Sequence, residues 1–396
     1  MFSILSVLTN NKNIAVNTQS IFTASSSNSD PELAVKELKH QLNDPSIRFV
    51  LFFCSASFNL AKLAYALNEQ FQDVGISGCT TAGEITPNGY ERGSITAIGF
   101  SNQDFCVQVG SVKNLKRFTL GEAQTMLDQL RSQCTLPSTA LNGFAITLVD
   151  GLSIDEEIFL ATLNSALGSI PSFGGSAGDD VNLASTHVFF DGEFHTDAAA
   201  VLMVNTRFEF EVFTTHHLRP THKKFVVTDA EPQNRRVNEL NADLAANEYA
   251  DALELSADQL SNDICTLNPL AVKIGDQYFI RSIQSIERDS SLTFFCAMEN
   301  GIALTLMQPS DLKENLIDLF NGIESRIGKP QIVIGCDCFL RRREAELKGE
   351  DQQVSELLKA FNVIGLNTYG EQFSGMHINQ TFTAVAIGQR RLNESV

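Results

Sequence analysis

The stretch Gly365–Thr383, GLNTYGEQFSGMHINQTFT, combines glycines at positions 365, 370 and 375 with a tyrosine, a glutamate, a histidine and an asparagine. Glycine weakens strands and marks bulges, tight bends or places where two backbones approach closely. The stretch is therefore not a plain strand. It lies between Phe361–Ile364 and Phe382–Ile387, two apolar segments that are each typical of a short strand.

Two other stretches are similar to this one. Ile76–Glu84, ISGCTTAGE, can be set beside Val363–Glu371, VIGLNTYGE, and the alignment matches two glycines, a threonine and the final glutamate. Phe173–Asp180, FGGSAGDD, is a third glycine-rich turn that carries carboxylates. A similarity that recurs along a chain indicates an internal repeat.

Each turn follows the same lead-in, an apolar segment and then apolar residues at helical spacing. The three lead-ins are Phe49–Cys54 with Leu60–Phe71, Phe144–Val149 with Asp155–Leu167, and Ile332–Gly335 with Val354–Phe361. The sequence thus predicts an α/β (α+β) fold of mixed, largely antiparallel sheets with covering helices, built from about three repeated strand–helix–strand units. Hairpins are expected where two strand-like segments follow closely, at Ile95–Ser101 with Phe105–Ser111 and at Ala199–Val204 with Phe208–Thr215.

Composition limits the function. The 396 residues carry a formal net charge of -18, which repels phosphate backbones and argues against nucleic acid as a partner. No apolar run approaches the roughly 20 residues that span a bilayer, so no membrane association is expected. Met1–Leu8 is interpreted as a first strand rather than a signal peptide, and the eight scattered cysteines as free thiols of a cytoplasmic protein.

Catalytic motifs are missing from the sequence. It contains no GxSxG, HExxH, P-loop or dinucleotide-binding fingerprint, and no Ser-His-Asp order can be argued. We therefore expect no enzyme activity. A weaker alternative is an enzyme that uses Cys79 or Cys336 as its nucleophile.

Several motifs together resemble a known family. They are GCTTAGEI at Gly78–Ile85, LVDGL at Leu148–Leu152, FGGSAGDD at Phe173–Asp180 and YGEQFSGMHINQTF at Tyr369–Phe382. In combination they resemble the FIST sensory domain, and the resemblance covers nearly the whole chain. It implies an N-terminal FIST domain over residues 1–220 and a C-terminal FIST domain over residues 221–396.

The resemblance also implies a function. A FIST protein without an attached kinase or cyclase is similar to the stand-alone nitric-oxide-sensing haem proteins of the family, so haem b and a gas ligand are expected. The partner that reads the state would be a separate histidine kinase or a cyclic-dinucleotide enzyme. The alternative is a sensory module without haem that binds a small molecule such as an amino acid.

Histidines are the first candidates for a haem ligand, because His is the usual proximal ligand of haem iron. His377 lies in the glycine-rich tail, where glycines would let the backbone approach a flat macrocycle. Alternatively, His377 has only a structural role and hydrogen-bonds a backbone carbonyl to hold the loop. His216 and His217 follow a strand that would turn one ring inward and one outward, unless both rings are solvated at the strand end.

The remaining candidates come from the same tail. Tyr369 could ligate the iron or hydrogen-bond a bound gas. Without haem, Glu371 and Asn379 could hold the amine and carboxylate groups of an amino acid. Because the three turns are related, Glu84, Asp179 and Glu371 are expected to line one pocket.

Overall fold

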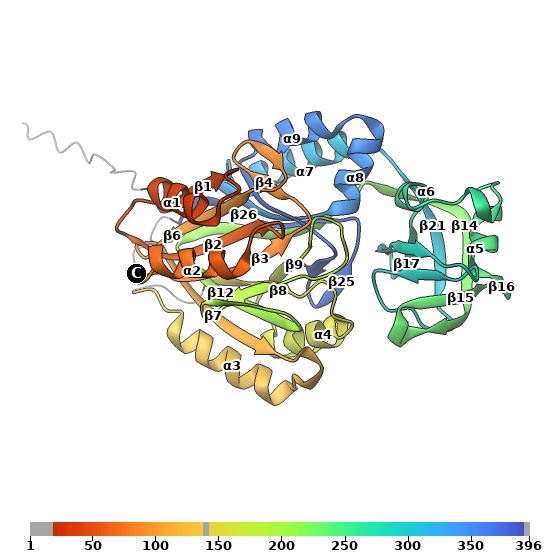
Figure 1. Cartoon of the computed structure of the whole chain (residues 1–396), viewed down its shortest axis with the longest axis horizontal. Helices are drawn as coiled ribbons and strands as arrows, with labels where there is room; N and C mark the ends of the chain where they lie inside the picture. Colours follow the sequence, from red (N-terminus) through yellow and green to blue (C-terminus); the bar gives the residue numbers. More distant parts are fainter. Residues whose placement is uncertain (1–18, 138–141, 392–396) are drawn as a thin grey trace, which may run out of the picture.

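The computed structural model describes residues 19–137 and 142–391, so the predicted strand Met1–Leu8 lies outside the described residues. Three mixed sheets surround a common core, each with helices on its outer face, and a smaller β-rich part stands to one side (Figure 1). The predicted fold class, including its repeated strand–helix–strand units, is confirmed. Within the described residues, every helix is too short or too polar to cross a bilayer.

Three units repeat one order of elements, which is strand, helix, strand, helix, strand, hairpin, strand; unit 3 adds one further helix, α8 (Phe339–Lys348), before its second repeated helix. Unit 1 comprises β1 (Ile21–Ser26), α1 (Pro31–Gln41), β2 (Ile47–Ser55), α2 (Leu60–Gln70), β3 (Gly75–Thr81), β4 (Glu84–Thr86), β5 (Gly89–Glu91) and β6 (Ile95–Ser101). Unit 2 comprises β7 (Phe105–Lys113), α3 (Leu120–Gln133), β8 (Gly143–Val149), α4 (Glu156–Leu167), β9 (Ser172–Ser176), β10 (Val188–Phe190), β11 (Glu193–His195) and β12 (Ala198–Thr206). Unit 3 comprises β13 (Phe208–Thr215), α7 (Leu312–Ile327), β22 (Ile332–Cys338), α8 (Phe339–Lys348), α9 (Asp351–Ala360), β23 (Val363–Thr368), β24 (Glu371–Phe373), β25 (Met376–Ile378) and β26 (Phe382–Arg390).

The hairpin of each unit does not stay on its own sheet. The strand orders are β1-β6-β2-β3-β10-β11 for sheet 1, β25-β24-β9-β8-β12-β7 for sheet 2 and β13-β26-β22-β23-β4-β5 for sheet 3. The hairpin of unit 1 thus completes the sheet of unit 3, that of unit 3 completes sheet 2, and that of unit 2 completes sheet 1. The three units are linked in a closed cycle.

Two predicted hairpins are wrong. The segments that became β6 and β7 are consecutive, yet β6 pairs with β1 and β2 whereas β7 pairs with β12. In the same way, β12 pairs with β7 and β8, and β13 pairs with β26. The short links between these strands carry the chain from one sheet to the next, a change that alternation within a strand cannot reveal.

In every unit the two central strands are parallel, as expected when a helix connects them. An equivalent glycine lies on the second of these strands each time: Gly78, Gly174 and Gly365. A Cβ at these positions would lie 2.2, 2.0 and 1.8 Å from a carbonyl oxygen of the neighbouring strand. The repeated glycine is therefore required by the close approach of two backbones.

Burial follows the layers. The inner faces of all three sheets form a central core with members such as Phe53, Leu148, Leu202, Ile334 and Val385. One further cluster lies between each sheet and its helices: α1 and α2 on sheet 1, α3 and α4 on sheet 2, and α7 and α9 on sheet 3. We call the three sheets with these helices the three-sheet body.

The remaining part, residues 216–310, is inserted between β13 and α7 and has a core of its own. This inserted domain comprises β14 (Leu218–Glu231), β15 (Arg236–Leu240), β16 (Asp243–Leu244), α5 (Ala245–Ala252), α6 (Asn262–Leu267), β17 (Leu270–Ile274), β18 (Gln277–Arg281), β19 (Ile283–Ile286), β20 (Leu292–Phe294) and β21 (Ala303–Pro309). It lies beside α8 and β25 of the three-sheet body (Figure 1). The division into 1–220 and 221–396 stays a prediction; residue 220 lies within β14.

Candidate functional site

The glycine-rich tail forms the exchanged hairpin β24–β25, and the inserted domain docks on it. Arg281 donates a hydrogen bond to the carbonyl oxygen of His377 at 3.1 Å. The amide of Ser282 donates to Asn379 Oδ1 at 3.3 Å, and Gln380 Nε2 donates to a carbonyl oxygen of α6 at 3.0 Å. The tail therefore joins the two parts of the molecule.

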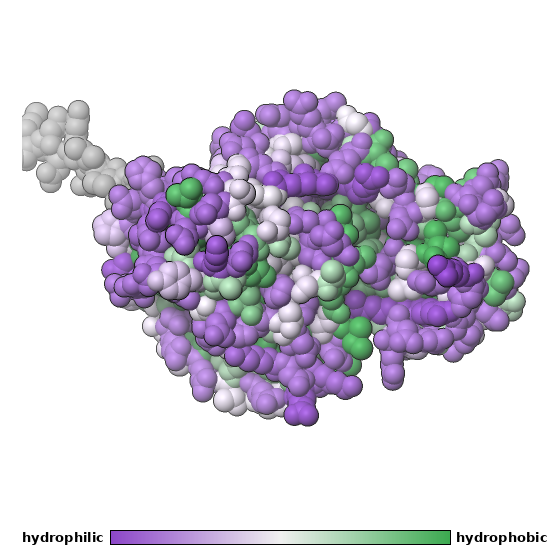
Figure 2. Space-filling view, viewed as in Figure 1, coloured by the Kyte–Doolittle hydropathy of each residue, from purple (hydrophilic) through white to green (hydrophobic). Residues whose placement is uncertain are grey.

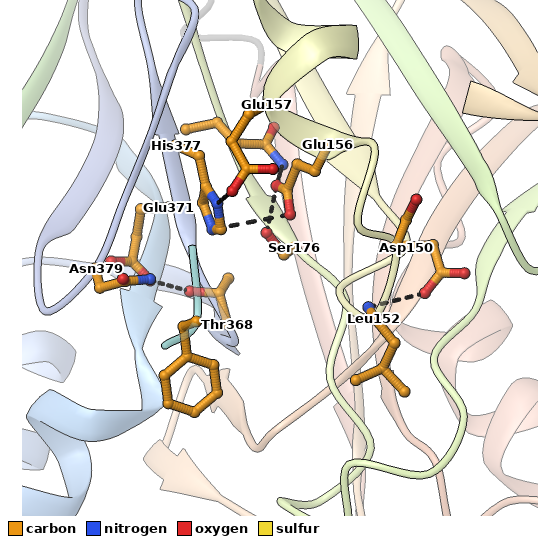
Figure 3. A network of polar contacts seen from close by, with 12 residues as sticks. Asp150, Leu152, Glu156, Glu157, Ser176, Thr368, Glu371, His377 and Asn379 are labelled. Carbon is orange, nitrogen blue, oxygen red and sulfur yellow. Dashed lines mark hydrogen bonds and ion pairs between the residues drawn. The ribbon is translucent and has the colours of Figure 1, made fainter. Parts of the chain in front are cut away.

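His377 is buried between two glutamates from the first turn of α4 (Figure 3). Its Nδ1 lies 3.3 Å from Glu157 Oε1, and its Nε2 lies 3.8 Å from Glu156 Oε2. Burial alone lowers the pKa of His377, but the negative charge of the two glutamates outweighs it, so the pKa is raised. An imidazolium held between two carboxylates is the arrangement that this geometry favours.

Glu157 also ties α4 to the inserted domain. Arg235 Nη2 lies 3.0 Å from Glu157 Oε2, and the amide of Ala297 donates to Glu157 Oε1 at 3.0 Å. Burial raises the pKa of Glu157, yet the hydrogen bond from His377 and the charges of His377 and Arg235 together lower it well below its usual range. Glu157 is thus an ionised link between α4, β25 and the inserted domain.

The surroundings of His377 do not fit an axial haem ligand. A Cβ at Gly370 would lie 1.9 Å from His377 Nε2, so the backbone just before β24 covers this nitrogen directly. The other nitrogen is occupied by Glu157. Haem iron needs a free ring nitrogen that faces an open, flat slot, and neither nitrogen of His377 offers one here.

His216 and His217 lie at the start of the inserted domain, away from His377 on the chain. Arg341 Nη1 lies 3.1 Å from His217 Nδ1, and Glu344 Oε1 lies 2.8 Å from His217 Nε2, so both ring nitrogens are engaged. Burial lowers the pKa of His217, and a neutral ring fits a guanidinium on one side and a carboxylate on the other. Burial likewise lowers the pKa of His216, which borders a separate cavity of about 380 Å³ with Tyr278.

Glu371 is enclosed rather than exposed to a pocket. Its two oxygens accept hydrogen bonds from the hydroxyl groups of Thr368 and Thr381 and from the amide of Thr381. Glu84 has an equivalent setting, with Thr81 and Ser94 as donors. Burial raises the pKa of Glu84 to about 7 and that of Glu371 to about 8.

Tyr369 points toward the third related turn. Its hydroxyl donates to Asp179 Oδ1 and accepts from the amides of Asp179 and Leu183, both at 3.3 Å. Burial and the neighbouring Asp179 raise the pKa of Tyr369, so its proton stays on the phenol. This excludes a phenolate at neutral pH and gives Tyr369 the role of holding the loop that follows Asp179.

That loop has an unusual backbone. Asp180, Val181 and Leu183 have φ values of 54°, 67° and 53°, in the left-handed region that a β-branched residue such as Val181 rarely adopts. The Asp179 carboxylate holds the loop by accepting hydrogen bonds from the amides of residues 183, 184 and 185 at 2.7 to 2.8 Å. Backbone strain that a structure actively maintains is a pointer to function.

The loop borders a cleft of about 260 Å³ between the three-sheet body and the inserted domain. Apolar side chains gather along this boundary on the face shown in Figure 2. The lining residues come from both parts: Ala82, Arg92, Val181, Leu183, Phe339, Leu340, Arg342, Arg343 and Glu346 from the three-sheet body, and Asn262, Asp263, Thr266, Ile283, Gln284 and Phe295 from the inserted domain. Mixed apolar and convergent polar groups at a junction of two domains are typical of a ligand site.

One ion pair crosses the cleft. Arg343 of α8 forms a two-pronged contact with Asp263 of α6, with both N–O distances at 2.9 Å. Its neighbour Arg342 donates to Asn367 Oδ1 at 3.0 Å and stacks over the ring of Tyr90. The cleft thus places two guanidinium groups beside apolar walls.

Sequence reasoning missed the cleft. None of the predicted residues His377, Tyr369, Glu371, Asn379, His216 and His217 lines it, although Tyr369 packs against Phe339 with ring centroids 5.4 Å apart. The available signal was the arginine run at 341–343, which directly follows a strand of the third unit. Its significance depends on α6 of the inserted domain, a partner that no local pattern identifies.

Cys79 and Cys336 do not suit nucleophilic catalysis. Both thiols are completely buried, and burial raises the pKa of each above its ordinary value. A nucleophilic cysteine needs a thiolate that a substrate can reach. The structure thus gives the weaker enzyme alternative no support.

Comparison with known proteins identifies the family. The family model of the FIST N domain matches residues 48–243, and that of the FIST C domain matches residues 245–374. The chain belongs to the FIST family. FIST domains are sensory domains of signal-transduction proteins that bind small ligands.

More distant comparisons add little about this FIST chain. No curated protein matches its sequence. Solved structures that match it include a cyanuric acid hydrolase, at 6% identity, with 93% of this chain and 99% of that chain covered and a TM-score of 0.40. At that TM-score the similarity supports no conclusion about the FIST chain.

Proposed function

We propose that this FIST protein senses a small molecule that binds in the cleft between the three-sheet body and the inserted domain. The observation that carries the proposal is the cleft itself, about 260 Å³ in volume and lined from both parts. A ligand there contacts two parts that are otherwise joined by the tail hairpin, polar links and a small apolar cluster around Phe295. Binding would therefore stabilise one relative position of the inserted domain, the change that a partner protein can detect.

The lining indicates the kind of ligand. Arg343 pairs with Asp263 across the cleft and Arg342 pairs with Glu346, so an acidic group of a ligand would replace a carboxylate on one of these arginines, and an amine would replace Arg343 on Asp263. Phe295 and Phe339 pack edge to face, with ring centroids 5.5 Å apart, and supply an apolar wall. These features support a small carboxylic acid, including an amino acid, as the ligand.

The test is ligand-induced thermal stabilisation with a panel of amino acids and small carboxylic acids. A ligand that binds the folded state raises the melting temperature in a concentration-dependent way. For a compound that stabilises the wild type, Arg343→Ala should raise the dissociation constant by about tenfold or more. Arg326→Ala is the matched control, because Arg326 of α7 forms a similar two-pronged pair with Glu211 of β13, outside the cleft.

Equal responses of Arg343→Ala and the control would contradict a cleft site. A panel in which no compound stabilises the wild type would contradict this ligand class. Both results leave the family assignment untouched, because that rests on the domain matches.

The expectation of haem b and nitric oxide is tested separately. After expression with sufficient haem, a Soret band in the purified protein would support it, and a colourless protein would count against it. If a band is present, His377→Ala should leave it unchanged, because the ring nitrogens of His377 are not accessible to a macrocycle. A loss with His216→Ala or His217→Ala would move the ligand to the boundary of the inserted domain.

A histidine kinase or a cyclic-dinucleotide enzyme remains the proposed partner. The formal net charge of -18 favours a basic surface on that partner. The association rate should then fall as ionic strength rises. Binding to such an enzyme that is indifferent to salt would contradict this part of the proposal.

A further inference from the structure

Two cysteines meet at the outer side of sheet 2, independently of the cleft. Cys106 lies in β7 and is half-buried, whereas Cys134 directly follows α3 and is buried. Cys134 Sγ is 3.0 Å from the carbonyl oxygen of Cys106. Cys106 Sγ is 3.6 Å from the carbonyl oxygen of Gln133, the residue before Cys134. Each sulfur atom thus lies against the backbone at the other cysteine.

The two thiols differ in their acidity. A hydrogen bond from the Cys134 thiol lowers the pKa of Cys106 to about 6, and the same contact raises the pKa of Cys134. Cys106 therefore loses its proton more readily than an ordinary cysteine, and it is half-buried beside a protonated thiol. An accessible thiolate with a second cysteine next to it is the arrangement of redox-sensitive sites.

We propose that Cys106 and Cys134 form a dithiol that hydrogen peroxide converts into a disulfide. The Cys106 thiolate attacks one oxygen of the peroxide and the O–O bond breaks, which gives a sulfenic acid and a hydroxide that takes a proton from solvent. Cys134 loses its proton and attacks the sulfur of Cys106. The S–O bond then breaks, and the oxygen leaves as a second water molecule.

The disulfide would fasten the end of α3 to β7. Because α3 covers the outer face of sheet 2, oxidation would restrain this helix. The chain also contains a matched comparison. Cys54 Sγ is 3.8 Å from the carbonyl oxygen of Cys79, but both thiols are fully buried and burial raises their pKa values.

The experiment treats the reduced full-length protein with hydrogen peroxide, alkylates the remaining thiols with N-ethylmaleimide and maps the peptides by mass spectrometry. We expect a Cys106–Cys134 link, a loss of two hydrogen atoms from the intact mass, and a higher melting temperature after oxidation than before. Cys106→Ser and Cys134→Ala should each abolish the link. Cys54→Ala and Cys79→Ala should leave it intact.

Three outcomes would overturn the proposal. They are sulfinic acid at Cys106 with Cys134 still alkylated, a link between other cysteines, and complete alkylation after peroxide treatment. If Cys134→Ala fails to fold, Cys106→Ser still decides the question, because Cys106 is half-buried at the edge of sheet 2 and its removal leaves a smaller gap in the core.

Discussion

The turns after β3 and β23 differ from the turn after β9, although all three occupy the same place in their units. After β3 and β23, Glu84 and Glu371 fold back and accept hydrogen bonds from a threonine three residues earlier and from a later Ser or Thr. After β9, Asp179 instead accepts from three successive amides of an added loop. The first two turns are closed within the body, and the third reaches the cleft.

The difference separates the two turns that serve only the fold from the one turn that also borders the cleft. Two copies bury a carboxylate without any contact to the candidate site. The turn of unit 2 has Asp179 and Asp180 where the other two turns have a glycine and a glutamate, and it adds residues with positive φ, two of which line the cleft. Divergence within the repeat therefore marks the surface where we place the ligand.

The largest effect should come from the feature that all three copies share. Gly78→Ala, Gly174→Ala and Gly365→Ala each place a methyl group against a carbonyl oxygen of the adjacent strand. Each substitution should lower the free energy of unfolding by about 3 kcal/mol, as overpacking between backbones that cannot separate does. Urea unfolding monitored by circular dichroism measures this. An unchanged free energy of unfolding for any one of the three variants would show that the units are not equivalent at this position.

Asp179→Ala should have the next largest effect. It leaves three amides of the loop without their acceptor, at a cost of about 2 kcal/mol. Hydrogen exchange at Leu183, Ala184 and Ser185 should accelerate, and ligand binding should weaken with it. Protection that is unchanged at these amides would show that the loop does not depend on Asp179.

The two closed turns should respond to pH. Their folded-state pKa values, about 7 for Glu84 and about 8 for Glu371, lie above the ordinary value of 4.5. The folded protein thus retains protons that the unfolded chain releases, so the stabilisation is complete below pH 4.5 and declines as pH rises through these values. Glu371→Gln, which is neutral at every pH, should lack this decline and should therefore be more stable than wild type at pH 9.

At pH 5 the same variant should resemble wild type, because the glutamate is then protonated in the folded state. Glu84→Gln should behave alike, with its gain levelling off about one pH unit earlier, because the folded-state pKa of Glu84 is about 7 and that of Glu371 about 8. Chemical unfolding at a series of pH values separates the two. A gain of equal size at pH 5 and pH 9 would show that the cause is not ionisation.

The smallest effect is expected for Tyr369→Phe. This change removes the hydrogen bond to Asp179 and two long contacts from the amides of Asp179 and Leu183, but it leaves the bonds from three loop amides to the Asp179 carboxylate in place, so it should cost about 1 kcal/mol. Thermal unfolding measures it, and Tyr65→Phe is a control, because the Tyr65 side chain is 65% exposed on α2. A loss as large as that of Asp179→Ala would show that the tyrosine, rather than the amides, determines how the loop is held.

The repeat and its lead-ins could be predicted from the sequence because each signal is local. Within each unit, the apolar run, the helical spacing and the strand glycine (Gly78, Gly174 or Gly365) are each recognised from a short window of sequence. The helix α8 was missed, because Arg341–Glu344 is polar in sequence while several of its residues are buried through ion pairs. A buried charged helix has no apolar stripe to detect.

The candidate site depended on contacts that sequence cannot show. His377 was singled out for its ring and its neighbouring glycines, but its position between Glu156 and Glu157 is set by α4, more than two hundred residues earlier in the chain. The same holds for Arg343, whose partner Asp263 belongs to the inserted domain. The residue types indicate which chemistry is possible, but the fold determines which side chains contact one another.

The cyclic exchange of hairpins has a consequence for biosynthesis. When β4 and β5 leave the ribosome, the strand that receives them, β23, is still hundreds of codons away from translation. The first unit must therefore wait with an exposed hairpin, and sheet 1 must wait for β10 and β11. Assembly becomes a late event that requires almost the entire polypeptide. A nascent chain that stops before unit 3 would accordingly expose unpaired strands and bind chaperones, instead of folding by itself.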